Sequence, residues 1–124
     1  MKEEVQRWLK QAEDDLSSAI ANIGIERYYV ASFLAQQAAE KALKALLIKQ
    51  GKGLIKMHNL IIMGKKANLP DELIKKCDAL NAVYTETRYP DAVGPIPSEK
   101  FTLEMAEDDA AIAKEVLAWL KNKI

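Results

Sequence analysis

The segment from residue 36 to residue 47 constrains the fold more than any other part of the chain. Its sequence is QQAAEKALKALL, in which alanines return at helical spacing. Small side chains on one side of a helix allow a short distance to neighbouring helices. A separate arc of the same helix carries Phe33, Gln36, Glu40, Leu43 and Leu47. A helix with two such sides lies at the centre of a bundle or between a bundle and a partner subunit, so we predict that this arc forms a dimer interface.

Two further segments show the periodicity of amphipathic helices. Apolar residues recur at spacings of three and four between Val5 and Ile23, and again between Leu103 and Leu120. Asn22 and Gly24 are predicted terminators of the first helix, because both tolerate the left-handed conformation. The alanine-rich helix is expected over about residues 26–50, with Gly51 as its stop.

Turn and cap residues separate the remaining elements. Asn68 precedes Leu69-Pro70 and is the predicted cap of a helix that Pro90 ends, and Thr102 is the predicted cap of the last helix. Residues 91–97 are expected to form a loop, and no segment is typical of a strand. The sequence therefore predicts an all-α antiparallel up-and-down bundle of four main helices and one short helix.

Length and composition favour one globular domain over residues 1–124. Hydrophobic residues make up 49% of the chain and charged residues 29%, which is unlike a disordered or membrane-spanning protein. No apolar run has transmembrane length and no secretory signal is present, so we expect a cytoplasmic protein. Cys77 is the single cysteine, and its place on an apolar stripe favours a small buried hydrophobe over a reactive thiol.

Positive charge is concentrated in one stretch of an otherwise neutral chain. Lysine and arginine number 18, as do aspartate and glutamate, but no acidic residue lies between Glu40 and Asp71. Lysines from this stretch that could attract a phosphate-bearing ligand are Lys41, Lys44, Lys49 and Lys52. The alternative is a solvated lysine-rich segment without a ligand.

Arg88 is the first candidate binding residue. It continues the helical stripe of Cys77 and Tyr84, and a guanidinium directed at a bundle interior requires a carboxylate partner or a cleft that holds an anion. The carboxylates bordering apolar faces are Asp15, Glu40 and Asp109. Both interpretations, a structural ion pair and a contact to an anion or nucleotide, remain open from the sequence.

The residues after Arg88 and the single histidine each allow two interpretations. Tyr89 and Asp91 flank Pro90, either as an ordinary helix end or as part of a binding site. His58 either begins a helix or transfers a proton. One histidine without a cysteine or carboxylate cluster predicts no metal site. Gly51-Lys52-Gly53 lacks the rest of a phosphate-binding loop, and we predict no cofactor.

Several of these patterns together resemble the HEPN domain family, whose members are linked to nucleotides and RNA. The resemblance rests on Trp8 with Asp14-Asp15-Leu16, a tyrosine at 28 or 29 before Phe33, the segment QQAAEKALKA, His58 with Leu60, and Arg88-Tyr89-Pro90, in that order. It implies a small helical bundle, usually a homodimer. It also implies frequent coupling to a separately encoded minimal nucleotidyltransferase, as in toxin–antitoxin pairs.

Ribonucleases of this family carry an arginine followed four to six residues later by a histidine. Arg88 matches the arginine, but no histidine follows His58 anywhere in the chain. The resemblance therefore predicts a non-catalytic dimeric module that binds a nucleotide or RNA, a nucleotidyltransferase partner, or both. The alternatives are a divergent ribonuclease toxin with Arg88 and His58 as catalytic candidates, and a purely structural dimerisation partner.

Overall fold

The computed structural model describes residues 2–91 and 94–124, so positions 92 and 93 of the predicted loop lie outside the described residues. Within these ranges the regular elements are all helices, which confirms the predicted all-α fold. Their bounds are α1 (Lys2–Gly24), α2 (Tyr28–Lys49), α3 (Leu60–Lys66), α4 (Asp71–Asn81), α5 (Val83–Arg88), α6 (Pro97–Lys100) and α7 (Leu103–Lys121).

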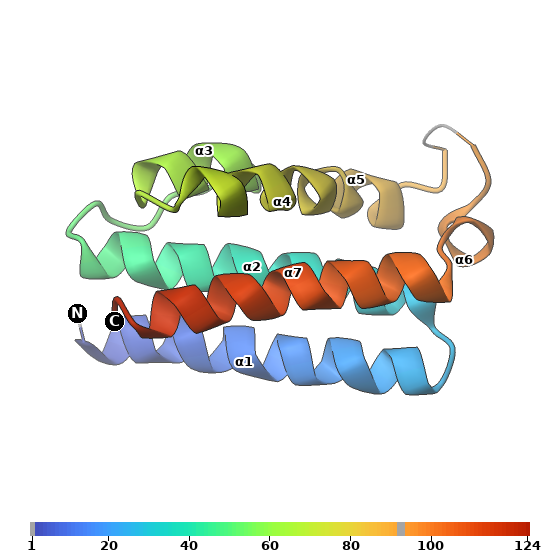
Figure 1. Cartoon of the computed structure of the whole chain (residues 1–124), viewed down its shortest axis with the longest axis horizontal. Helices are drawn as coiled ribbons and strands as arrows, with labels where there is room; N and C mark the ends of the chain where they lie inside the picture. Colours follow the sequence, from blue (N-terminus) through green and yellow to red (C-terminus); the bar gives the residue numbers. More distant parts are fainter. Residues whose placement is uncertain (1, 92–93) are drawn as a thin grey trace.

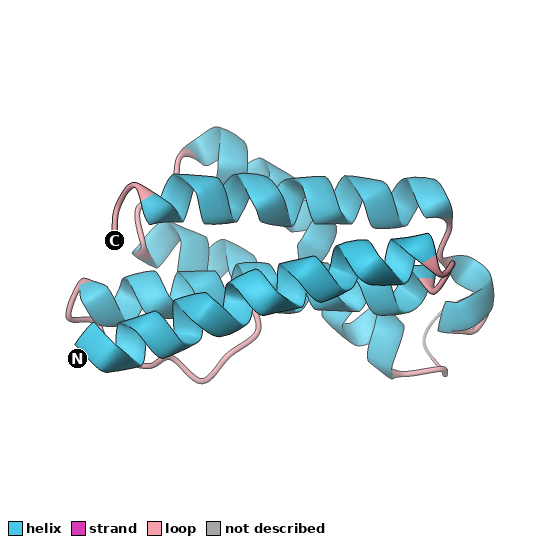
Figure 2. Ribbon diagram, turned by 90° about the horizontal axis from the view of Figure 1, so that it is seen from below, coloured by secondary structure: helices cyan, strands magenta, loops and turns pink. Residues whose placement is uncertain are grey.

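The long helices run along one axis of the molecule, with α1 antiparallel to α2 and α7 (Figure 1). α2 and α7 lie between α1 on one side and the layer formed by α3, α4 and α5 on the other. α4 and α5 follow one another with a break at Ala82 and together replace the single fourth helix that the sequence predicts. The view from below shows α1 and α7 as long helices with the short helices behind them (Figure 2).

α2 is the central element, because it contacts each of the other helices. Its alanines at positions 31, 35, 38, 39, 42 and 45 are completely buried. Alanine at these positions lets α1 and α7 approach α2 closely, as the sequence predicts. Cys77 is buried in the same core, and its burial raises the pKa of the thiol to about 11, which confirms its role as a small hydrophobe.

The predicted helix ends are confirmed except at Asn68. Thr102 Oγ1 accepts a hydrogen bond from the backbone N–H of Met105 at 3.2 Å, and Gly51 follows α2 with a φ of 78°. Asn68 does not cap α4: it has a φ of 62° directly after α3, and Pro70 occupies the cap position. α1 ends at Gly24, as predicted, although the residue with the left-handed conformation is Glu26, with a φ of 62°.

The predicted dimer arc of α2 requires a larger correction. Gln36, Leu43 and Leu47 are completely buried within the chain, and Glu40 is 3% exposed. The cause is the layer of α3, α4 and α5, which packs on this side of α2. Phe33 alone of the five keeps partial exposure, so this arc is an interior surface of the subunit rather than an open face.

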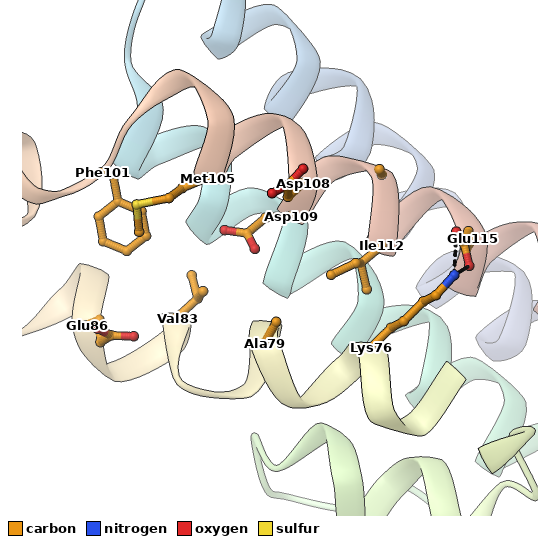
Figure 3. A pocket seen from close by; sticks show the side chains of 11 residues that line it. Lys76, Ala79, Val83, Glu86, Phe101, Met105, Asp108, Asp109, Ile112 and Glu115 are labelled. Atoms are coloured by element: carbon orange, nitrogen blue, oxygen red, sulfur yellow. Dashed lines mark hydrogen bonds and ion pairs between the residues drawn. The ribbon is translucent and has the colours of Figure 1, made fainter. Parts of the chain in front are cut away.

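A cavity of about 550 Å³ separates α7 from α4 and α5 (Figure 3). Its walls combine apolar side chains with several carboxylates. Among the described residues no helix combines the length and apolar character required to cross a membrane.

Candidate functional site

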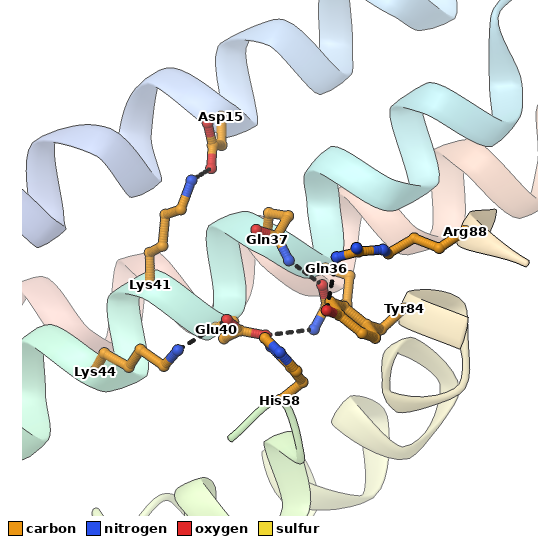
Figure 4. Close-up of polar contacts among 9 residues, drawn as sticks. All are labelled: Asp15, Gln36, Gln37, Glu40, Lys41, Lys44, His58, Tyr84 and Arg88. Atoms are coloured by element: carbon orange, nitrogen blue, oxygen red, sulfur yellow. Dashed lines mark hydrogen bonds and ion pairs between the residues drawn. The ribbon is translucent and has the colours of Figure 1, made fainter. Parts of the chain in front are cut away.

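Arg88, Tyr84 and His58 form one contiguous group beside α2 (Figure 4). Arg88 Nη1 donates a hydrogen bond to Tyr84 Oη at 2.6 Å, and its guanidinium carbon lies 4.8 Å from the centroid of the Tyr84 ring. The His58 ring stacks on the same tyrosine with a centroid distance of 4.0 Å and an interplanar angle of 15°. Tyr84 therefore joins the C-terminal end of α5 to the segment that precedes α3.

Local sequence explains these positions. Tyr84 and Arg88 are four residues apart on α5, so their side chains lie on the same face of the helix. His58 precedes Asn59, which caps α3 by accepting hydrogen bonds from the N–H groups of Ile61 and Ile62. The cap fixes the direction in which the chain enters α3 and thereby places His58 next to α5.

Glu40 connects this group to the interior. One of its carboxylate oxygens accepts a hydrogen bond from Gln36 Nε2 at 3.1 Å and lies 2.9 Å from His58 Nδ1, while the other pairs with Lys44 Nζ at 3.0 Å. An ionised Glu40 requires the proton on Nδ1 of a neutral His58, which leaves Nε2 as the acceptor. The His58 side chain is 49% exposed, so part of the ring is open to solvent.

The four predicted lysines are not brought together. Lys41 pairs with Asp15 at 2.6 Å, and Lys44 is buried between Glu40 and the face of Trp8, so both are already engaged. Lys49 and Lys52 are exposed at the C-terminal end of α2, and Lys52 donates a hydrogen bond to the Lys66 carbonyl. That end of α2 is remote from the C-terminal end of α5, where Arg88 lies (Figure 1).

The carboxylates considered as partners of Arg88 are occupied elsewhere or face another part of the fold. Asp15 pairs with Lys41, Glu40 pairs with Lys44 and His58, and Asp109 lines the cavity next to α7. Arg88 is exposed and lies against Tyr84 instead. Tyr89 and Asp91 are exposed just beyond the end of α5.

A second hollow adjoins this group on the side of His58. Its volume is about 300 Å³, and it is lined by Trp8, Lys44 and residues 54–58. An indole ring, an imidazole and the exposed Lys56 thus lie around one depression. Aromatic faces and cations are the groups that stack on bases and pair with phosphates.

Sequence reasoning did not select Tyr84, which the structure places at the centre of the group. Its spacing of four from Arg88 was a usable signal for their contact. The stacking of Tyr84 on His58 could not be predicted from the sequence, because the two residues are far apart in the chain and only the packing of the helices brings them together. Over residues 2–91 and 94–124 no group of three or more metal-ligating side chains converges.

Comparison with known proteins identifies the family. Residues 5–123 match the model of the HEPN domain. The structure is similar to that of TT1696 from Thermus thermophilus, with 32% identity, a TM-score of 0.89 and coverage of 98% of both chains. It is also similar to ST0689, an archaeal HEPN homologue, with 35% identity, a TM-score of 0.85 and coverage of 97% of both chains.

A curated relative comes from Methanocaldococcus jannaschii and bears the name "Putative toxin MJ1304". The alignment with this relative is 131 residues long, with 30% identity, and covers 93% of this chain and 84% of that protein. The resemblance suggested by QQAAEKALKA, His58 and Arg88-Tyr89-Pro90 is thereby confirmed, and the chain belongs to the HEPN domain family.

Proposed function

We propose that this chain is a non-catalytic, dimeric HEPN module that binds a phosphate-bearing ligand, a nucleotide or RNA, at Arg88. The observation that carries the proposal is the exposed Arg88 guanidinium held against Tyr84 at the edge of the group that contains His58. Arg88 is oriented by a neighbouring ring and forms no ion pair with a carboxylate among the described residues. Its guanidinium can therefore donate two parallel hydrogen bonds to a phosphate.

Ion pairs within the subunit bear on which residues we propose as ligand contacts. Lys41 and Lys44 stabilise the subunit through Asp15 and Glu40, so their charge is locally compensated. Lys56 and Trp8, in the hollow beside His58, are better placed to extend the Arg88 contact than Lys49 and Lys52. We propose that a nucleotide lies from Arg88 toward this hollow.

Replacement of Arg88 tests the proposal directly. Arg88→Ala should weaken binding of a fluorescent single-stranded RNA by about 10- to 100-fold at low salt, because a charged hydrogen-bonded contact contributes about 1.5–3 kcal/mol. The slope of log affinity against log salt should become less steep by about one phosphate contact. Fluorescence anisotropy over a salt series measures both quantities.

Arg7→Ala is the matched control, since Arg7 is an exposed arginine on α1. It removes the same net charge and should leave most of the affinity. Equal losses of RNA affinity in the two variants would show that binding depends only on the net charge of the protein. If the unchanged protein binds neither RNA nor nucleotides at low salt, the proposal of a phosphate-bearing ligand is wrong.

The contact of Glu40 with His58 supports a second candidate function, a divergent ribonuclease. A carboxylate that orients Nδ1 leaves Nε2 to exchange a proton with a ribose hydroxyl, and Arg88 could stabilise the charged phosphate in the transition state. Metal-free cleavage of RNA that is lost in both Arg88→Ala and His58→Ala would establish this function and replace the non-catalytic one.

We further propose a homodimer and a minimal nucleotidyltransferase as the protein partner, in keeping with a toxin–antitoxin pair. Because four residues of the predicted arc are buried, the dimer has to use other surfaces, and partly exposed Phe33 and exposed Tyr89 are the candidates that remain near the site. Light scattering measures the dimer, and co-purification with an encoded neighbour tests the partner. A partner bound without any nucleotide affinity would favour a purely structural role.

A further inference from the structure

The cavity between α7 and the α4–α5 layer contains a carboxylate that has no cationic partner among the described residues. Asp109 is 7% exposed and lines the cavity, and its side chain extends from α7 toward Val83 and Glu86 on α5 (Figure 3). No lysine, arginine or histidine that the structure describes forms an ion pair with its oxygens. Buried carboxylates are normally paired, because removal of the charge from water is costly.

A buried hydroxyl on α2 lies near this carboxylate. Ser32 Oγ on α2 is completely buried and has no hydrogen-bond partner in the described part of the chain. Its hydroxyl nevertheless acts on the Asp109 carboxylate as a hydrogen-bonding group, which lowers the pKa of Asp109. Desolvation dominates and raises the pKa of Asp109 to about 6, with a further increase from the charges of Asp108 and Glu86.

The remaining charges around the cavity favour a cation as its occupant. Glu86 pairs with Lys100, and Glu115 pairs with Lys76 at 2.8 Å, so these two carboxylates are compensated. Asp108 and Asp109 have no such ammonium partner within the described ranges. The cavity therefore presents excess negative charge, which disfavours phosphates and other anions.

The walls show that this cation has an apolar body. Val83, Phe101, Met105 and Ile112 line the cavity together with Ala79. The volume of about 550 Å³ falls within the usual range of about 300–1,000 Å³ for small-molecule sites, which are mostly apolar with a few polar groups. A divalent metal ion needs about six oxygen ligands, and the described carboxylates do not converge in that way.

We propose that this cavity binds a small organic cation whose ammonium group pairs with Asp109 and whose apolar body packs on Val83, Phe101, Met105 and Ile112. The site is separate from the Arg88 group and does not depend on the proposed nucleotide-binding function. An ammonium ligand supplies the cationic partner that Asp109 lacks, and a charge-assisted hydrogen bond to a carboxylate is stronger than a neutral one.

The test uses a charged and a neutral ligand of nearly the same shape, 2-phenylethylammonium and 2-phenylethanol. In an NMR titration of the ¹⁵N-labelled full chain at pH 7.5, the ammonium should shift resonances around Val83, Phe101 and Ile112. The alcohol should bind at least about tenfold more weakly, since an ion pair with a desolvated carboxylate contributes about 1.4 kcal/mol or more.

Variants assign the effect to Asp109. Asp109→Asn keeps the shape and should lower the affinity for the ammonium to that for the alcohol, whereas Asp78→Asn, at an exposed position of α4 outside the cavity lining, should retain most of it. Ala79→Trp should block both ligands by filling the cavity from an exposed position on α4. It serves as the second variant if Asp109→Asn does not fold.

The pH profile gives an independent readout. Affinity for the ammonium should fall as the pH decreases through about 6, because protonation removes the charge of Asp109. The other charged groups around the cavity are unchanged in Asp109→Asn; they are Asp108, Glu86, Glu115, Lys76 and Lys100. A flat pH profile in that variant would therefore assign the titration to Asp109.

Three outcomes would overturn the proposal. The first is equal affinity for the ammonium and the alcohol, and the second is unchanged affinity in Asp109→Asn. The third is dissociation of a dimer by the ammonium without shifts confined to the cavity, which would assign this space to a second copy of the chain.

Discussion

Glu40 receives three side-chain contacts although it is almost completely buried. Gln36, Lys44 and His58 come from two different segments and meet at this one carboxylate. A buried ion pair contributes little by itself, but the loss of one partner leaves the other uncompensated. The Glu40 carboxylate is thus a structural requirement for the Lys44 ammonium as well as a positioning group for His58.

Glu40→Gln should destabilise the protein by about 3 kcal/mol, because the Lys44 ammonium remains buried without its counter-charge. Urea denaturation at pH 7 measures the change in the free energy of unfolding. Glu115→Gln is the control: Glu115 pairs with Lys76, and both side chains are about half exposed, so the cost should be roughly 0–1 kcal/mol. Equal costs in the two variants would contradict a special role for Glu40.

Tyr84 and Arg88 illustrate what local sequence can and cannot predict about a site. Arg88 stood out because a guanidinium on an apolar stripe requires an explanation, and its contact with Tyr84 follows from helical spacing. The contact of His58 with Glu40 and Tyr84 depends on how the segment before α3 crosses α2 and α5. No periodicity encodes that crossing, so the sequence left His58 with two interpretations.

Among the elements, α2 shows why prediction succeeded for the helix but not for its surroundings. Periodicity and Gly51 predict its extent within two residues at either end. Which neighbour covers each side depends on the arrangement of all the helices. The arc of Leu43 and Leu47 is apolar in either case, and the layer of α3, α4 and α5 covers it here.

The small residues of α2 should be as important as the large ones. Ala42→Leu should reduce the free energy of unfolding by about 1–3 kcal/mol, because Ala42 is completely buried and the added carbons have to displace packed neighbours. Thermal and urea unfolding followed by circular dichroism measure the loss.

The same substitution at the exposed Ala21 of α1 provides the matched control. Ala21→Leu should change stability by no more than about 0.5 kcal/mol. Full stability of Ala42→Leu would show that α2 has room on that side and would contradict its role as a close-packing helix.

On the scale of the whole molecule, zero net charge conceals an uneven distribution. The described lysines that lie near α1 and α2 are partly neutralised by Asp15 and Glu40, whereas the cavity near α7 keeps excess carboxylate. We therefore expect Asp109 to lower the free energy of unfolding as the pH rises, whereas a carboxylate that is paired in the native state raises it.

Folding raises the pKa of Asp109 from 3.8 to about 6, so the native state binds this proton more tightly than the unfolded chain. The stabilisation that protonated Asp109 gives the native state is fully present below pH 4 and is lost as the pH rises through 6. Asp109→Asn should remove this dependence and, at pH 7, should be more stable than the parent by at most about 3 kcal/mol.

Denaturant unfolding of both proteins between pH 4 and pH 8 measures the difference. Subtraction of the two curves cancels the titration of the other carboxylates, and Asp78→Asn, at an exposed position of α4, serves as the control. A difference that grows toward low pH would have the wrong sign and would show that Asp109 is stabilised as a carboxylate in the native state.

The described ends of the chain lie at one end of the bundle, away from the C-terminal end of α5 (Figure 1). Lys2 and Ile124 even line the same small hollow next to Lys49. A fluorophore, an affinity tag or a tether to a sensor surface at either terminus would therefore point away from Arg88. The molecule can be immobilised for binding measurements with its candidate site facing the solution.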